Sequence, residues 1–232
     1  MSKNLISFLL LIITVPIFAF GQTAKVEVVS ILDRQVNQSE LDDEEIIPAL
    51  MKSFYSTKVP AGVSGVFRDY TKDEFEPKLN LSSKKLSLRD VLKEVTTLET
   101  RYQWKEENGV INVYPINDYP ILDTVIAEFY LENKTKENLL SELLNTKEFQ
   151  EYLKKNQLSV FPFQIISGLL GKQVKTRRFT INLKNVTVRE ILNEIVRQNG
   201  KSTWIYKEYE SNFLDKENTK RYYRLDFLVD TP

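Results

Sequence analysis

The stretch Asn185–Val196 reads NVTVREILNEIV, and its pattern decides the fold class. Thr187 and Glu190 have the spacing of a capping box, in which a hydroxyl and a carboxylate satisfy free N–H groups at a helix start. The apolar positions recur with helical spacing and predict one buried face: Val188, Ile191, Leu192, Ile195 and Val196. The remaining positions predict a solvated, salt-bridged face: Arg189, Glu190, Asn193, Glu194 and Arg197. Asn199-Gly200 then predicts the helix end.

Strand patterns flank this helix on both sides. Residues 178–183 read RFTINL and alternate apolar with polar side chains, which predicts a half-buried strand. Residues 202–209, STWIYKEY, and 221–228, RYYRLDFL, predict two further strands. The second half of the chain therefore contains a strand–helix–strand–strand unit over about residues 177–228.

The same unit is written one hundred positions earlier. Lys85–Thr96 reads KLSLRDVLKEVT, with a second capping box at Ser87 and Asp90. Five residues are identical at the constant offset: Lys84, Arg89, Leu92, Glu94 and Trp104. The hairpin that follows contains Asn108-Gly109, the preferred pair for a two-residue type I′ turn. That turn sets Trp104 opposite Val113 and Glu106 opposite Ile111, so the first repeat covers about residues 77–115.

A weaker, partial repeat lies between the two copies, over about residues 125–145. It predicts a strand at 125–131 and a helix from Thr135, with another helix after it. Ahead of the first repeat, residues 48–58 predict a short helix, and residues 59–67, VPAGVSGVF, predict a turn leading to a strand. The expected fold is α+β, built from repeated strand–helix–strand(–strand) units with small sheets packed on amphipathic helices.

The chain is expected to carry a leader and two halves. Residues 1–21 combine a positive charge, an apolar run and the small-x-small triplet before Gln22, which predicts a signal peptide cleaved after Gly21. The two prolines within residues 114–123, YPINDYPILD, mark the best boundary. The first half is then 22–118 and the second 119–232. We expect a periplasmic or secreted protein with no stable membrane insertion after cleavage.

The composition excludes several classes of function. The 232 residues include 32 Lys+Arg and 32 Asp+Glu, and this balance argues against a nucleic-acid partner. There is no His and no Cys, which excludes histidine-dependent nucleophiles, imidazole or thiolate metal sites and disulfides. We therefore expect no cofactor, no metal and no catalytic residue of these types.

Short matches to catalytic motifs have simpler explanations. Residues 82–85, SSKK, fit the S-x-x-K spacing of penicillin-binding enzymes, but the accompanying S-D-N and K-T-G triplets are missing. The acids on the predicted helices lie beside basic residues, which favours a salt-bridged face over a catalytic pair. Residues 42–45, DDEE, lack the spacing of a calcium loop and suit a helix start better.

The repeats resemble a known module. The sequence FTINLKNVTVREILNEIVRQNGKSTWIY, Phe179–Tyr206, is similar to the secretin and TonB N-terminal domain, and Leu79–Val113 resembles a second, diverged copy. The resemblance implies a non-catalytic α+β module that docks onto other envelope proteins. No secretin core or transporter barrel follows the repeats in this sequence.

Four residues are candidate contacts for a partner: Trp104, Trp204, Tyr206 and Arg178. Tryptophan is a frequent interface anchor, although a position shared by two repeats favours a shared core contact. Arg178 ends a basic run that includes Lys172 and Lys175, for which an edge charge is the simpler reading.

Three functions remain open from the sequence. The leading hypothesis is an exported, non-enzymatic protein-interaction module of the Gram-negative cell envelope, which docks to an envelope, secretion or uptake partner. The second is a carboxylate-dependent hydrolase acting on envelope glycans, which requires two acids in a cleft. The third is a self-assembling structural protein, because strand–helix repeats with open edges can pair with copies of themselves.

Overall fold

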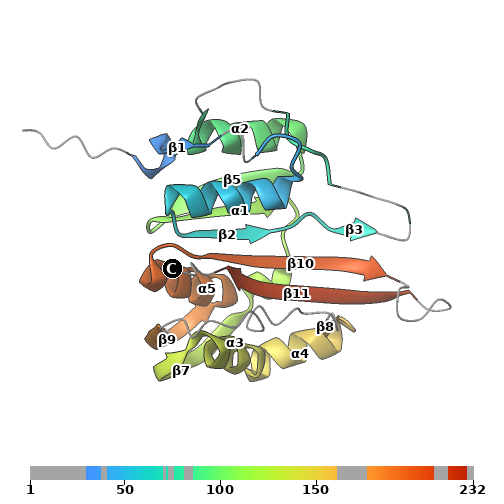
Figure 1. Cartoon of the computed structure of the whole chain (residues 1–232). Coiled ribbons are helices and arrows are strands. Elements are labelled where there is room, and N and C mark those ends of the chain that lie inside the picture. Colours follow the sequence, from blue (N-terminus) through green and yellow to red (C-terminus); the bar gives the residue numbers. More distant parts are fainter. Residues whose placement is uncertain are drawn as a thin grey trace, which may run out of the picture.

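The structure is a computed structural model. It describes residues 30–37, 41–69, 72, 76–80, 86–160, 177–211 and 219–228. The predicted signal peptide, the S-x-x-K match at 82–85, and Lys172 and Lys175 lie outside the described residues. The α+β class is confirmed, with helices packed against sheets (Figure 1).

One seven-stranded sheet combines strands from both halves of the chain. Its strand order is β5 (Tyr102–Glu107), β6 (Val110–Pro115), β2 (Ala61–Ser64), β10 (Thr203–Ser211), β11 (Lys220–Leu228) and β8 (Ser159–Val160). The short strand β3 (Arg68–Asp69) pairs with β10 beyond the end of β2. β2 runs parallel to both β6 and β10, and so joins the hairpins of the two repeats.

The second repeat forms the predicted strand–helix–strand–strand unit. It consists of β9 (Arg178–Thr187), α5 (Val188–Asn199), β10 and β11, with β10 and β11 antiparallel. The Thr187 hydroxyl accepts a bond from the Glu190 N–H at 3.2 Å, and the Glu190 carboxylate accepts one from the Thr187 N–H at 2.7 Å. Gly200 follows the helix with a φ of 77°, a conformation that suits glycine. The predicted capping box and helix end are confirmed.

The first repeat has the same order with a shorter leading strand. It consists of β4 (Leu86–Ser87), α2 (Leu88–Leu98), β5 and β6, and the Ser87–Asp90 capping box is present. Both turn residues, Asn108 and Gly109, have positive φ, as a type I′ turn requires. The predicted register, with Trp104 opposite Val113, is confirmed. β4 is reduced to two residues and pairs with β1 (Gln35–Val36).

The remaining elements lie outside the two full repeats. The partial repeat forms β7 (Val125–Thr135) and then α3 (Lys136–Leu144), and β7 pairs antiparallel with β9. Thr135 lies at the N-cap of α3, but its hydroxyl donates to the Asn138 side chain and makes no bond to the helix backbone. The other helices of the described residues are α1 (Ile46–Thr57), α4 (Lys147–Lys155), and the 3-10 turns η1 (Ile31–Asp33) and η4 (Pro120–Asp123).

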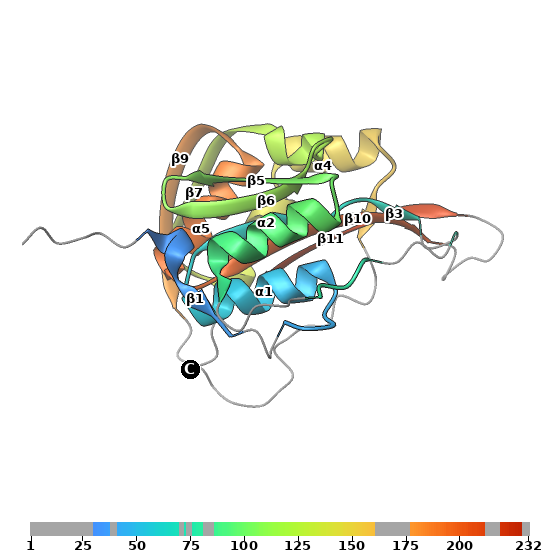
Figure 2. The same cartoon turned by 90° about the horizontal axis from the view of Figure 1, so that it is seen from above.

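Two hydrophobic cores lie on opposite faces of the large sheet. One lies under α1 and α2, and the other is formed with α5, α3, α4 and the β7–β9 pair. Figure 2 shows α1 on one side of the sheet and β7, β9 and α4 on the other. Because side chains alternate along β10, Ile205 joins the first core whereas Trp204 and Tyr206 join the second. Each repeat therefore covers one face of a shared sheet with its own helix.

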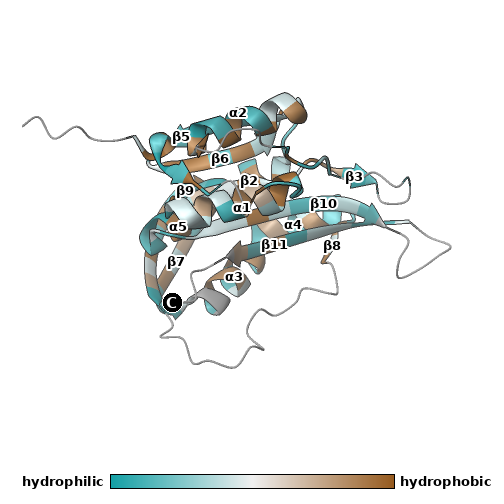
Figure 3. Ribbon diagram, turned by 45° about the horizontal axis from the view of Figure 1, so that its top comes forward, coloured by the Kyte–Doolittle hydropathy of each residue, from teal (hydrophilic) through white to brown (hydrophobic). Residues whose placement is uncertain are grey.

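The helices are amphipathic, as their sequences predict. In Figure 3, α2 and α5 each carry hydrophilic and hydrophobic residues on different sides. The apolar positions of α5 are buried, from Val188 to Val196. Arg189, however, was predicted on the solvated face and is 7% exposed, which corrects that prediction. It is buried because the segment ahead of η4 supplies an acidic partner, as described below.

β2 is the element that the sequence located least well. Residues 59–67 were predicted as a turn leading to a strand, yet the central strand itself occupies Ala61–Ser64 and is fully buried. Gly62 lies under the indole of Trp204, and a Cβ at this position would fall within 3.0 Å of three indole atoms. The small residues of this segment are therefore required by packing against β10. They are not required by a local turn.

Candidate functional site

The four candidate contact residues do not share one surface. Trp204 and Tyr206 are fully buried, so these two side chains do not form an exposed docking surface. Trp104 is half-buried on β5 and packs against the core under α1 and α2. Arg178 is exposed at the start of β9, where its guanidinium donates to the Asn133 carbonyl at 2.7 Å. Only Trp104 and Arg178 retain surface for a partner.

Trp204 is a core residue with its polar atom satisfied. Its Nε1 donates to the Asn193 side chain on α5 at 2.8 Å. The Arg189 guanidinium lies 5.8 Å from the indole ring, within the range of a cation–π contact. These contacts tie β10 to the helix of its own repeat.

Arg189 also links the two halves through a largely buried ion pair. It contacts the carboxylate of Asp118, which lies in the predicted boundary segment. Asp118 accepts further bonds from the Ser64 hydroxyl at 2.9 Å and from the Tyr119 N–H at 2.8 Å. Burial raises the pKa of Asp118 above its ordinary value, against the lowering effect of Arg189. The cluster joins α5, β2 and the boundary segment, and it satisfies its carboxylate internally.

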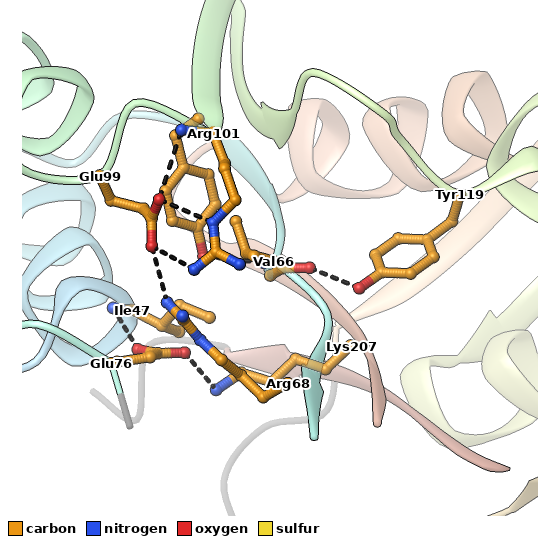
Figure 4. A network of polar contacts seen from close by, with 10 residues as sticks. Ile47, Val66, Arg68, Glu76, Glu99, Arg101, Tyr119 and Lys207 are labelled. Atoms are coloured by element: carbon orange, nitrogen blue, oxygen red, sulfur yellow. Dashed lines mark hydrogen bonds and ion pairs between the residues drawn. The ribbon is translucent and has the colours of Figure 1, made fainter. Parts of the chain in front are cut away.

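A second ionic network lies beyond the same, C-terminal end of β2 (Figure 4). Glu99 accepts bonds from Arg101 Nε at 2.8 Å and from Arg68 Nη2 at 3.1 Å. Hydrogen bonding by Arg101 lowers the pKa of Glu99 to about 2, although burial opposes the shift. Glu76 accepts bonds from the Ile47 N–H and from Lys207. Glu76 thereby holds the start of α1 to β10 through Lys207, and Glu99 holds β3 through Arg68, so both carboxylates have structural roles.

A third buried carboxylate belongs to Glu208 on β10. It is 2% exposed and accepts bonds from the Tyr206 hydroxyl at 2.7 Å and from Arg221 at 2.8 Å. Burial raises the pKa of Glu208 above its ordinary value. Both of its oxygens accept hydrogen bonds from side chains of β10 and β11, so the carboxylate is held within the sheet.

A groove of about 830 Å³ is lined in part by Arg221, the ion-pair partner of Glu208. Among the described residues its lining comes from α4, β8, β10 and β11: Gln150, Leu153, Lys154, Asn156, Gln157, Leu158, Ser159, Glu210, Thr219, Lys220 and Arg221. Glu210 is the one acid among them, whereas acid-catalysed glycoside hydrolysis uses a pair of carboxylates across the scissile bond. The described lining therefore does not contain the pair of carboxylates that the hydrolase hypothesis requires.

The strand β5 forms one edge of the large sheet, and it pairs with β6 on one side. Glu107 and Val110 close the two-residue turn, and Ile116 N–H donates to the Arg101 carbonyl at 2.7 Å. Hydrogen-bonded pairs recur at every second residue of an antiparallel ladder. Gln103, Lys105 and Glu107 therefore bond to β6.

The alternate peptide groups of β5 consequently point away from β6. The N–H and C=O groups of Trp104 and Glu106 face outward, and within the described part of the chain no strand pairs with them. The N–H of Tyr102 donates to the Glu99 carbonyl, which leaves its own carbonyl facing outward. An edge of this kind can receive an extended strand of another protein through main-chain hydrogen bonds. This edge is the candidate docking site.

Sequence reasoning identified β5 and its register but not its position at the sheet edge. It also missed the ion pair of Arg189 with Asp118, whose partners are 71 residues apart. The two prolines around Asp118 marked a boundary in the sequence, but no local pattern there indicates that a buried arginine faces the carboxylate. The Arg189–Asp118 pair can be recognised only from the way α5 packs against the boundary segment.

The described residues also bear on metal binding and on membrane insertion. They include no group of three or more acidic side chains placed to hold a metal ion. None of their helices has the length and apolar character needed to cross a membrane. Comparison of the chain with protein-family models, curated proteins and solved structures finds no match.

Proposed function

We propose that the chain is an exported, non-enzymatic protein-interaction module of the Gram-negative cell envelope, which docks an extended protein strand along β5. The observation that carries this proposal is the outward-facing peptide groups of Trp104 and Glu106 at the edge of the large sheet. Strand addition satisfies such groups and gives affinity through the main chain. Export is supported by the leader pattern in residues 1–21.

The surroundings of this edge favour docking over catalysis. Lys105 and Glu106 are exposed, and Trp104 presents part of its indole beside the outward peptide groups. A partly exposed aromatic residue next to a hydrogen-bonding edge provides an anchor for a partner side chain. The buried carboxylates Glu99 and Glu208, by contrast, are held in ion pairs with arginine.

The test places a photo-crosslinking amino acid at Lys105 in the chain exported to intact envelopes. Thr180, exposed on β9, is the control position. We expect a discrete crosslinked protein from position 105 and not from position 180. Recovery of the same products from both positions would refute docking at β5.

A proline substitution tests the hydrogen-bonding mechanism. Glu106→Pro removes an outward N–H without removing a bond to β6, and proline is tolerated on edge strands. Glu106→Thr removes the same charge but keeps the N–H. We expect the crosslink to be lost in E106P and retained in E106T. Equal crosslinking in both variants would contradict strand addition.

A further inference from the structure

We propose that the strand received by β5 is the β5 strand of a second copy of this chain, paired antiparallel about a two-fold axis at Trp104. This inference rests on the proposed docking edge and deepens it by naming the occupant. The two seven-stranded sheets would then continue through the interface. An isologous contact of this type is the commonest geometry of soluble dimers.

The outward peptide groups fit this register. Hydrogen-bonded pairs at the new interface must join residues whose N–H and C=O groups face outward, and Trp104 is the central one of these. Each Trp104 would exchange two bonds with the other copy's Trp104. Each Glu106 N–H would donate to the Tyr102 carbonyl of the other copy. The N–H of Tyr102 is not required, which matters because Glu99 already accepts it.

The charged residues of β5 also favour the register centred on Trp104. Centring on Trp104 sets Lys105 opposite Gln103, Glu106 opposite Tyr102 and Glu107 opposite Arg101 of the other copy. Opposite charges on facing residues stabilise a strand pair, and like charges destabilise it. The Arg101–Glu107 pairs would add to the existing Arg101–Glu99 and Lys105–Glu107 contacts, because Arg101, Lys105 and Glu107 are partly exposed.

The neighbouring registers each oppose like charges. Centring on Lys105 sets the two Lys105 side chains against each other, and centring on Glu106 does the same for Glu106. Centring on Gln103 sets Arg101 against Lys105. Charged residues on an edge normally discourage pairing. Here the sequence RYQWKEE discourages these alternatives and leaves the Trp104-centred pair without a like-charge contact.

The chain contains no cysteine, so single cysteines can report the register directly. In the proposed dimer Gln103 faces Lys105 of the other copy in a non-hydrogen-bonded pair, whose Cα atoms are about 4.5 Å apart. Such a pair lies within the range that a disulfide can bridge. Two Gln103 residues would lie on a diagonal, at about 7 to 8 Å.

The experiment mixes Gln103→Cys and Lys105→Cys chains, purified after export, under oxidising conditions. We expect a disulfide-linked dimer from the mixture and little from either variant alone. Light scattering of the cysteine-free chain should give twice the chain mass, and Glu106→Pro should halve it, whereas Glu106→Thr should not. A monomer at every concentration, or equal bridging in each variant alone, would overturn the proposal.

The envelope crosslink from Lys105 separates this inference from the proposed function. A product containing two copies of this chain supports both. A product containing a different protein, together with a monomeric mass in solution, refutes the dimer and leaves docking at β5 standing. No product at all, with a monomeric mass, refutes both.

Discussion

Replacing Gly62 by alanine should destabilise the protein strongly, because β2 and the indole of Trp204 occupy the same space. A Cβ on Gly62 would fall within 3.0 Å of three indole atoms. Non-bonded carbon atoms prefer about 3.5 to 4.0 Å. The indole or the strand must therefore move by more than about half an ångström.

Neither group can move without losing other contacts. Trp204 is fully buried and its Nε1 is bonded to Asn193. β2 is paired on both sides, where Gly62 lies between Asn112 and Trp204. Adding a methyl group to a packed core costs about 1 to 3 kcal/mol, and loss of the indole hydrogen bond adds about 1 kcal/mol. We expect Gly62→Ala to lower the free energy of unfolding by about 3 kcal/mol or more.

The measurement is urea denaturation followed by circular dichroism, in two backgrounds. In the Trp204→Leu background the obstructing ring is gone, so Gly62→Ala should cost less than about 1 kcal/mol. The coupling between the two sites is then about 2 kcal/mol. If Gly62→Ala costs the same in both backgrounds, the indole is not the obstacle and the packing argument fails.

Three further perturbations test the ionic and capping interactions. Arg189→Ala leaves Asp118 buried without its cation and should lower the free energy of unfolding in urea by about 3 to 5 kcal/mol. The control is Arg89→Ala at the matching position of the first repeat. Its ion pair is about half exposed, so this variant should lose less than about 1 kcal/mol. Equal costs would contradict the assigned role of Arg189. Thr187→Ala should lower thermal stability by about 1 kcal/mol through loss of the α5 cap, whereas Thr187→Ser should not. The pKa of Glu99 is about 2 in the folded protein against an ordinary 4.5, so its stabilisation is present above pH 4.5 and is lost as the pH falls toward 2. Wild-type stability minus that of Glu99→Gln should therefore shrink across this window, and a difference independent of pH would refute the assignment.

The local elements could be predicted because their signals are local. Capping boxes fixed the starts of α2 and α5, and Asn108-Gly109 fixed the turn and register of the β5–β6 hairpin. The outward peptide groups of β5 follow from that register alone. Whether these groups are free to bond to another strand does not follow from the register, because it depends on β2 pairing with β6 instead of β5.

Long-range packing explains what the sequence did not indicate. Trp104 and Trp204 hold the same repeat position and each faces the helix side of its own repeat. Trp204 is in the sheet interior, where α5 and β2 enclose it, whereas Trp104 is on an edge strand and stays half-buried. Two identical positions thus differ in exposure because their neighbours in the sheet differ.

The position of β2 also constrains how the chain reaches its native state. Ala61 pairs with Ile111 of the first half on one side and with Thr203 of the second half on the other. Contacts between distant segments slow folding because a long loop must close first. Until β10 is available, β2 presents an unpaired, largely apolar edge of the kind that promotes aggregation. A chain cut within residues 114–123 would retain that edge permanently, so we expect proteolysis there to yield an insoluble fragment, not a working half.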